Sequence, residues 1–389
     1  MTFMAAALLG ISMIGVVALS IQRVLVSWSL RRPVPCASVR PGISILKPLC
    51  GADDELETNL LAFSALAYPE YEVLLGVRDR RDAAWPLARK MAERWPSRFR
   101  VVLQQGTPGQ NPKVNQLVTL ERVARHELLF VSDSNTRPSP GQLDELAALF
   151  EDAEVACVSF PVSGTGHRSF GALLDNLHLA SSVGPGQLAA KALADMDLVV
   201  GKAMALRRGA LARLGGFVAY ANVLAEDYAI GCEVTSRLGQ RVAIGRLPVL
   251  NVACERTVRS FFQRYLRWGV VHRTAVSLPT SLVQALLNPW PLSMLAVAAA
   301  PSWLTGAGAL ATLGAKTLLD LSSARRLGCT PLGLAAVPAV PVKDALLFVA
   351  WVNGLFSRTV EWRGHRLRVG PGSRLEEPAT IPSAEEALS

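Results

Sequence analysis

The chain has 389 residues, enough for one large domain or two ordinary ones, and half of them are hydrophobic. The net charge of +9 does not indicate nucleic-acid binding, because no basic stripe interleaved with aromatic side chains is present and only 6% of the residues are aromatic. Arginines instead flank apolar segments, at Arg31-Arg32, 264–273, Arg325-Arg326 and 363–368. This arrangement favours anionic lipid headgroups as the partner.

The first segment, Phe3 to Val26, is almost wholly apolar and long enough to cross a hydrocarbon core of about 30 Å. A cleaved signal peptide is the alternative, but the segment has no basic start and no small-residue cleavage site before Arg31-Arg32. We therefore expect residues 1–30 to form a transmembrane anchor. The two arginines should hold the following domain on the cytoplasmic side, at a bacterial inner membrane or its equivalent.

From residue 40 to about 275 short apolar runs alternate with segments of helical periodicity. This alternation predicts an α/β domain with a mostly parallel, Rossmann-like sheet, in which ligands bind beyond the carboxyl ends of the strands. The expected strands are Ile43 to Leu46, Tyr71 to Val77, Phe99 to Gln104, Glu127 to Ser132 and Val155 to Phe160, and the expected helices are Asp54 to Ala67, Ala83 to Arg94, Val114 to Ala124 and Gln142 to Phe150.

Three apolar stretches follow between residues 282 and 358: Leu286 to Trp303, Leu304 to Leu321 and Leu332 to Phe356. Prolines interrupt the first and third, and the third also contains Lys343-Asp344, charges that a membrane segment tolerates only when they are paired or face a cavity. We expect this third stretch to be re-entrant, because the basic segment after it should be cytoplasmic. Residues 359–389 should form a basic segment and then, after Gly370, a disordered tail.

The six cysteines (36, 50, 157, 232, 254 and 329) contain no C-x-x-C pair, so their spacing favours neither a metal site nor a disulfide framework. Buried thiols in a reducing cytoplasm are the expectation.

Two acids stand just beyond predicted strands, at the edge where a ligand is expected. Asp133 follows the strand ending at Ser132 and is the candidate ligand for a divalent cation, Mg²⁺ or Mn²⁺. Asn135 occupies the position at which a D-x-D motif would have its second acid. A helix cap is the alternative role for Asp133, although the helix expected near Ser139 starts six residues later. Asp79 is expected to accept hydrogen bonds from a uracil ring or ribose.

Two further segments supply charge. Lys113, in Asn111-Pro112-Lys113, stands at a helix start, which is unfavourable for a cation unless an anion lies there, so we assign Asn111 and Lys113 to nucleotide or diphosphate binding over a solvated surface role. The adjacent acids Glu226 and Asp227 either complement a helix dipole or include a base poised to remove an acceptor's proton.

The last candidate segment is a helix containing Gln263, Arg267 and Trp268, which fall near one face. Arg267 offers a planar fork to a phosphate and Trp268 a flat wall for a sugar or lipid. A helix lying at the membrane interface, with arginines and Trp at headgroup depth, is the alternative, and both roles are compatible.

Taken in order, these segments resemble the processive-type family of inverting glycosyltransferases with a GT-A fold, and most closely its ceramide glucosyltransferase branch. The likeness covers nearly the whole chain; its narrower motifs are Asn111 to Asn115 and the closing 361–366, Glu-Trp-Arg-Gly-His-Arg. The resemblance implies a UDP-sugar donor, a divalent cation, inversion at the anomeric carbon and a lipid alcohol acceptor. It also implies that Asp227 is the base.

The identity of the acceptor stays open. Animal members of the family carry a histidine-containing stretch where this chain has residues 181–186, Ser-Ser-Val-Gly-Pro-Gly. Ceramide is the first candidate, and N-acetylglucosaminyl transfer to a hopanoid polyol, as in bacterial hopanoid-associated relatives, is the second. A polysaccharide synthase needs several solid spans, and the proline-broken stretches disfavour it. A sugar-binding scaffold without activity is disfavoured by the intact series of acids and Arg267.

Overall fold

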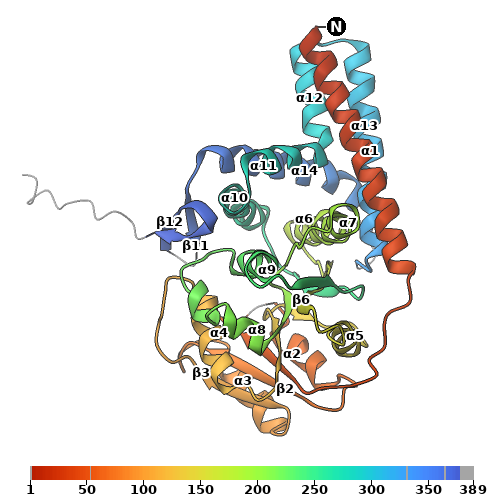
Figure 1. Ribbon diagram of the computed structural model, residues 1–389. Helices are drawn as coiled ribbons and strands as arrows, with labels where there is room; N and C mark the ends of the chain where they lie inside the picture. The colour runs from red at the N-terminus through yellow and green to blue at the C-terminus, as the bar shows by residue number, and fades with distance from the viewer. Residues whose placement is uncertain (1, 53, 330–331, 363–364, 377–389) are drawn as a thin grey trace, which may run out of the picture.

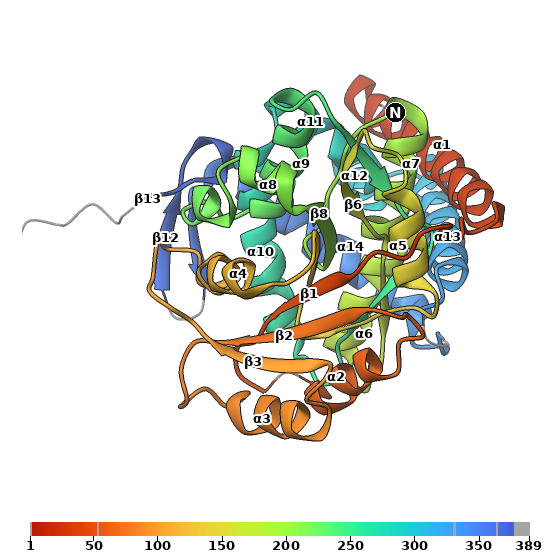
Figure 2. The ribbon, with the colours of Figure 1, turned by 60° about the horizontal axis from the view of Figure 1, so that its bottom comes forward.

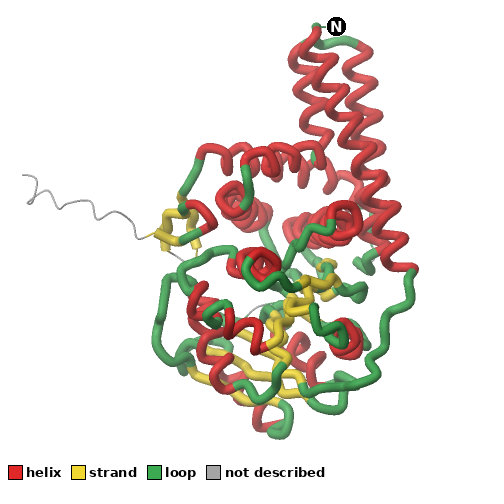
Figure 3. Tube along the Cα trace, viewed as in Figure 1, coloured by secondary structure: helices red, strands yellow, loops and turns green. Residues whose placement is uncertain are grey.

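The computed structural model describes residues 2–52, 54–329, 332–362 and 365–376, and shows a mixed α/β body from which a bundle of long helices projects (Figure 1). The N-terminus lies near the tip of the bundle. Tracing the chain by secondary structure separates the strands of the body from the all-helical bundle (Figure 3).

The body is built on a seven-stranded sheet in the order β3-β2-β1-β4-β8-β6-β9. The four strands from β3 to β4 are parallel, because hydrophobic runs joined by helices pack this way, while β8 runs antiparallel to both neighbours. The strands are β1 (Ile43–Pro48), β2 (Tyr71–Val77), β3 (Phe99–Leu103), β4 (Leu128–Ser132), β6 (Val155–Ser159), β8 (Ala203–Arg207) and β9 (Arg241–Ile244).

Helices cover both faces of this sheet, as the alternating sequence pattern predicts (Figure 2). On one face, Ile45, Val73 and Phe130 pack with apolar side chains of the helices 56–64, 85–94 and 142–149. On the other face, Leu46, Leu74 and Val131 pack with those of the helices 112–123, 208–213 and 226–236. The helices are α2 (Leu56–Ser64), α3 (Trp85–Arg94), α4 (Pro112–Val123), α5 (Gln142–Leu149), α8 (Arg208–Arg213) and α9 (Glu226–Ser236), with a 3-10 turn η2 (Phe217–Tyr220). The predicted strands and helices are confirmed to within a few residues at their ends.

A second layer lies between this body and the bundle. It consists of a three-stranded sheet of β5 (Thr136–Arg137), β10 (Val249–Val252) and β7 (Val162–Thr165), and the helices α6 (Phe170–His178), the π-helical turn η1 (Leu179–Val183), α7 (Gly184–Ala194) and α10 (Val258–Ala275). Helix α10 carries the predicted Gln263 to Trp268 segment and packs against α14 (Ala336–Phe356). The two helices cross almost backbone to backbone, since a Cβ atom on Gly354 would collide with the carbonyl of Gly269.

The projecting bundle consists of α1 (Phe3–Arg31), α12 (Pro289–Ala299) and α13 (Trp303–Arg326), with α11 (Leu278–Gln284), the turn η3 (Ala285–Leu287) and α14 lying crosswise at its base (Figure 1). By length and composition, α1 and α14 could each cross a membrane. The segments Leu278–Leu287 and Pro289–Ala299 form a pair bent by 83° that would count as a third span or a re-entrant loop.

The expectation that the third apolar stretch turns back as a re-entrant segment at its prolines and charges is wrong. Its residues 336–356 form one continuous helix, α14, which accommodates Pro341 within it, and the sharp bend lies instead between α11 and α12. The charges in this stretch are paired, as their burial requires: Lys343 and Asp344 of α14 meet Lys316 and Asp320 of α13 in a buried cluster, with Lys343 Nζ 3.0 Å from Asp320 and Lys316 Nζ 2.6 Å from Asp320.

The expectation of disorder after Gly370 is also wrong for residues 371–376, and 377–389 lie outside the described residues. A small antiparallel sheet of β11 (Thr359–Trp362), β12 (His365–Val369) and β13 (Leu375–Glu376), with the turn η4 (Pro371–Ser373), returns to the body. The Ser373 carbonyl accepts from the amide of Leu224 at 2.9 Å, and the Ser373 hydroxyl accepts from the amide of Ala225 at 3.1 Å. The C-terminal segment therefore fixes the loop that precedes Glu226.

No disulfide links the six cysteines, all of which lie in the described ranges. Cys157, Cys254 and Cys329 are buried as expected, but Cys36 is exposed in the connection after α1. The expectation of burial is therefore wrong for Cys36, and Cys50 and Cys232 are only half-buried.

Candidate functional site

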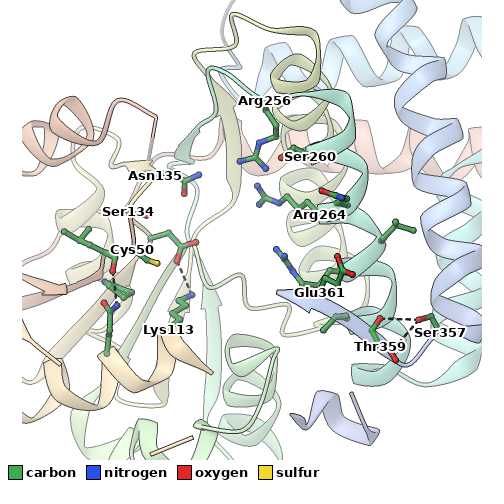
Figure 4. A pocket seen from close by; sticks show the side chains of 18 of the residues that line it. Cys50, Lys113, Ser134, Asn135, Arg256, Ser260, Arg264, Ser357, Thr359 and Glu361 are labelled. Carbon is green, nitrogen blue, oxygen red and sulfur yellow. Dashed lines mark hydrogen bonds and ion pairs between the residues drawn. The ribbon is translucent and has the colours of Figure 1, made fainter. Parts of the chain in front are cut away.

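A cavity of about 780 Å³ opens at the carboxyl ends of β1 and β4, between the body and helix α10. One wall comes from the strand ends and α4, and the opposite wall comes from α10 and the segment 353–361 (Figure 4). Its lining residues include Lys113, Asp133, Asn135, Arg256, Gln263, Arg264, Arg267 and Glu361.

Asp133 lies at the floor of this cavity, directly after β4, as the sequence pattern predicts. Lys113 Nζ lies 3.1 Å from its Oδ1 and Lys202 Nζ lies 3.3 Å from its Oδ2. Burial alone would raise the pKa of Asp133, but the two ammonium groups outweigh burial and hold this pKa well below its usual range. Asp133 is therefore a fixed anion. It does not cap α5, which begins only at Gln142.

Lys113 joins Asp133 to the predicted catalytic acids. Its Nζ lies 2.9 Å from Glu226 Oε1, and these carboxylates, together with that of Asp227, hold the pKa of Lys113 above its ordinary value in spite of burial. The anions at this helix start are the protein's own carboxylates, and the assignment of Lys113 to a nucleotide or diphosphate stays a prediction. Asn111 lies beneath the wall, where its side chain caps α4 and its amide donates to Glu226 Oε2 at 3.3 Å. It does not line the cavity.

Asp227 lies at the start of α9, beside Lys113. Its Oδ2 accepts from the amide of Gly201 at 2.5 Å and its Oδ1 from the amide of Tyr228 at 2.8 Å, so the carboxylate has one orientation. A Cβ atom on Gly201 would stand 2.7 Å from Asp227 Oδ2 and 3.0 Å from Lys113 Nζ. Only glycine fits between these two charged groups.

Glu226 is buried and tied to Lys113, whereas Asp227 is only half-buried. Burial, with a further contribution from the adjacent Asp227, raises the pKa of Glu226 against the lowering effect of Lys113. The expected crowding of charge at this helix start is therefore present. Of the two acids, Asp227 is the more accessible to an acceptor hydroxyl.

The opposite wall of the cavity is positively charged. Arg256, Arg264 and Arg267 line it, and Figure 4 shows Arg256 and Arg264 directed across the cavity toward Asn135. A buried acid, Asp175 of α6, orients two of them: its Oδ2 lies 3.1 Å from Arg264 and 3.5 Å from Arg256. Guanidinium groups held in this way are suited to bind phosphate oxygens.

The three residues predicted on α10 do not all face the cavity. Gln263 and Arg267 line the cavity, together with Arg264, which the sequence reasoning did not select. Trp268 instead packs beside Tyr265, with ring centroids 5.7 Å apart, and is absent from the lining. Its side chain contributes to the apolar contact beside α14, and its predicted contact with a sugar or lipid stays a prediction.

Asp79 lies at the same sheet edge, after β2, but it is exposed and outside the cavity lining. Its Oδ1 accepts from the amide of Arg81 at 2.7 Å, which shapes the turn. The nearby Asp82 accepts from the amides of Ala84 and Gly51, each at 2.9 Å. The predicted contact of Asp79 with a uracil ring or ribose therefore stays a prediction.

Sequence reasoning missed three residues of the floor: Lys47, Gly201 and Lys202. Lys47 is fully buried at the end of β1, and its Nζ donates to the backbone carbonyl of Asp133 at 2.7 Å. Lys202 immediately precedes β8, whose first residue pairs with Ser132, so the antiparallel register brings it beside Asp133. Pairing of β8 with β4 is a long-range contact, and no local sequence signal reveals it.

The donor atoms around Asp133 fit a cation. The oxygens Asp133 Oδ2 and Asn135 Oδ1 lie 3.3 and 3.2 Å from Lys202 Nζ, so they converge on one positive charge. Within the described residues no group of three or more His, Cys, Asp or Glu side chains is arranged to hold a metal. A divalent cation here would need most of its ligands from a bound diphosphate and water, as Mg²⁺ sites commonly have.

Comparisons with known proteins agree with this geometry. A family model described as glycosyl transferase family 21 matches residues 3–375. Ceramide glucosyltransferase 3 of Caenorhabditis elegans is 26% identical over 94% of this chain and 80% of its own length, and ceramide glucosyltransferase 1 of the same organism is 26% identical over 90% and 76%. Among solved structures, a mannosyltransferase of Pyrobaculum calidifontis in complex with GDP-Man and Mn²⁺ superposes with a TM-score of 0.56 at 21% identity, covering 90% of this chain and 99% of that one. That likeness supports the GT-A fold.

Proposed function

The chain belongs to glycosyl transferase family 21, and from this premise we propose that it transfers a hexose from a UDP-sugar to the hydroxyl of a membrane lipid, ceramide first among the candidates. The observation that carries the proposal is the pairing of two walls across one cavity. Asp133 and Lys113 stand on one wall, with Asp227 beside them, and three arginines face them from the other.

The arginine wall is suited to the donor. A sugar leaves a nucleoside diphosphate with its electron pair on a phosphate oxygen, and positive groups placed at that oxygen lower the barrier. Arg264 and Arg267, one turn apart on α10, would contact the diphosphate, and Gln263 would add an amide. A cavity of about 780 Å³ is of the size that takes a nucleotide-linked sugar.

Asp227 is the proposed base. Its carboxylate is oriented by two backbone amides and lies beside Lys113, which lines the cavity, although Asp227 itself is not among the lining residues. From there it would remove the proton of an acceptor hydroxyl that attacks the anomeric carbon. Attack from the side opposite the departing diphosphate inverts the anomeric centre. Glu226, held by Lys113, orients the ammonium group that faces Asp133.

Asp133 would hold a divalent cation, Mg²⁺ or Mn²⁺, together with the diphosphate of the donor. Such a cation neutralises charge that develops on the leaving phosphate. The mannosyltransferase with the similar fold was solved with Mn²⁺, which supports the use of a cation of this class here. Asn135 adds a neutral oxygen.

The acceptor would reach Asp227 from the membrane. The apolar exposed faces of α1, α11 and α13 would lie in or against the bilayer, with the body and its water-soluble donor on the cytoplasmic side. This arrangement brings a lipid hydroxyl and a UDP-sugar to one interface.

The test is an assay of purified full-length protein in lipid nanodiscs with UDP-glucose. Release of UDP that depends on added ceramide, with mass-spectrometric detection of the glycosylated lipid, is the expected result. Ceramide-free nanodiscs, and nanodiscs with a hopanoid polyol and UDP-N-acetylglucosamine, are the comparison arms. Turnover only in the hopanoid arm would mean that the acceptor is a hopanoid polyol and not ceramide. Equal UDP release without any lipid alcohol would contradict lipid glycosylation.

A further inference from the structure

Lys202 is a charged side chain that neither the sequence motifs nor the proposed reaction accounts for. Its side chain is only 8% exposed, and it is absent from the residues that line the cavity. Its ammonium nitrogen donates to Asp133 Oδ2 at 3.3 Å and to Asn135 Oδ1 at 3.2 Å. It therefore lies beneath the two oxygens that would face a cation, whereas Lys113 contacts Asp133 Oδ1 from the cavity side.

This position has an electrostatic consequence for the site. A D-x-D motif presents two negative groups to a cation, but here the second acid is Asn135, and the remaining charge of Asp133 already faces two ammonium groups. Like charges separated by a few ångströms repel strongly where water is excluded. A divalent cation arriving alone must therefore bind near fixed positive charge, whereas one arriving with a diphosphate brings its own compensating anion.

We propose that Lys202 is the resident cation of this site, and that it suppresses binding of a free divalent metal so that the metal binds only together with the donor diphosphate. The inference rests on the proposed function for the identity of the diphosphate, but its central claim concerns metal affinity alone. Lys202 acts through Asp133 and Asn135, so it is a positioning residue.

The experiment measures Mn²⁺ binding to the full-length protein in detergent by electron paramagnetic resonance, first without nucleotide and then with UDP. The variants are Lys202→Gln, which keeps a hydrogen-bond donor without charge, and Lys202→Arg, which keeps the charge. Lys191→Met is the matched control, because Lys191 also pairs with two acids, Asp195 and Asp197, but at the end of α7. Thermal melting of each variant reports on folding.

Without UDP, Lys202→Gln should bind Mn²⁺ about tenfold or more tightly than the wild type, while Lys202→Arg and Lys191→Met bind as the wild type does. UDP should then tighten Mn²⁺ binding more in the wild type than in Lys202→Gln. Unchanged or weaker Mn²⁺ binding in a folded Lys202→Gln protein overturns the inference. If Mn²⁺ alone behaves as expected but UDP changes Mn²⁺ affinity in none of the proteins, the role of Lys202 stands and the UDP-sugar donor is wrong.

Discussion

At the scale of single residues, the floor of the site is a set of balanced charges. Three acids and three lysines meet there within the body: Asp133, Glu226 and Asp227 with Lys47, Lys113 and Lys202. Because the floor is close to neutral, the net positive charge that a diphosphate encounters comes from the arginine wall. The donor should therefore be bound chiefly by Arg256, Arg264 and Arg267, and Asp175 is the fixed counter-ion of the first two.

Asp227→Asn tests the base. The amide retains the size of the side chain but cannot take a proton, so turnover should fall by about 10²-fold or more while the affinity for UDP is unchanged. Initial rates and titration calorimetry measure the two quantities. Asp195→Asn, which neutralises an exposed acid at the end of α7, is the control. Turnover near that of the wild type would move the base to Glu226.

Gly201→Ala tests how closely the base is held. The added methyl would stand 2.7 Å from Asp227 Oδ2 and 3.0 Å from Lys113 Nζ, so one of these groups must move. Turnover should fall about tenfold to a hundredfold, because small displacements of reacting groups are costly, with little change in melting temperature. Gly186→Ala on α7, where a methyl has open space, should leave both unchanged. Full activity of Gly201→Ala would mean that the Asp227 orientation is not required.

At the scale of elements, α14 determines where α10 holds its arginines. The two helices cross at Gly269 and Gly354, where neither tolerates a side chain, and the end of α14 supplies Asn353 to the cavity. Helix α14 is in turn joined to α13 by the buried cluster of Lys316, Asp320, Lys343 and Asp344. The position of the donor site is thus coupled to the packing of the projecting bundle.

Gly354→Ala should separate α14 from α10, because its Cβ atom would collide with the backbone of Gly269. We expect a lower melting temperature in detergent and an affinity for UDP reduced by about tenfold, since Arg264 and Arg267 move with α10. Gly314→Ala on α13 is the control, because its Cβ atom would lie in open space. This substitution should stabilise the helix, since alanine has a higher helix propensity than glycine. An unaltered UDP affinity in a destabilised Gly354→Ala protein would show that α14 does not position the arginines.

The elements that sequence predicted best are those whose signals are local. β1, β2 and β4 are buried apolar runs, and the acids beyond them follow directly from strand ends, so Asp133 and Asp79 were placed at the right edge. Antiparallel β8, the second sheet and the helices α6 and α7 depend on long-range pairing and were not predicted. The pairing of β8 with β4 also places Lys202 in the site. Helical spacing alone does not tell which face of α10 meets the cavity, so it does not separate Trp268 from Gln263 and Arg267.

Long-range contacts, which local sequence signals do not reveal, also explain the errors in the membrane region and the tail. Prolines suggested a break in the third apolar stretch, but Pro341 lies within a continuous α14 that neighbouring helices support. The tail after Gly370 has the composition of a disordered segment, yet Ser373 within it accepts hydrogen bonds from the amides of Leu224 and Ala225, through its carbonyl and its hydroxyl respectively. In both cases tertiary contacts overcame the local preference.

At the scale of the whole molecule, the apolar surface is concentrated on one side. The bundle of α1, α12 and α13 exposes large hydrophobic side chains such as Trp303, Leu310 and Leu318, and α11 at its base exposes Leu282 and Val283. Such a surface is typical of contact with lipid. The body, by contrast, lies beyond the end of the bundle, where α1 ends at Arg31 and Arg32 follows (Figure 1). The molecule should therefore sit with its donor cavity just outside one face of the membrane.

The last prediction decides which face this is. Cys36 is exposed in the connection between α1 and the body, so its thiol can react with a maleimide wherever the body is located. Because Arg31-Arg32 favours the cytoplasmic side, a membrane-impermeant maleimide should label Cys36 in inside-out vesicles and leave it unlabelled in right-side-out vesicles. Loss of labelling in Cys36→Ser identifies the site, and detergent-solubilised protein gives the full extent of reaction. Labelling of Cys36 from the outside would contradict a cytoplasmic donor site, since the body and its cavity follow Cys36 on the same side.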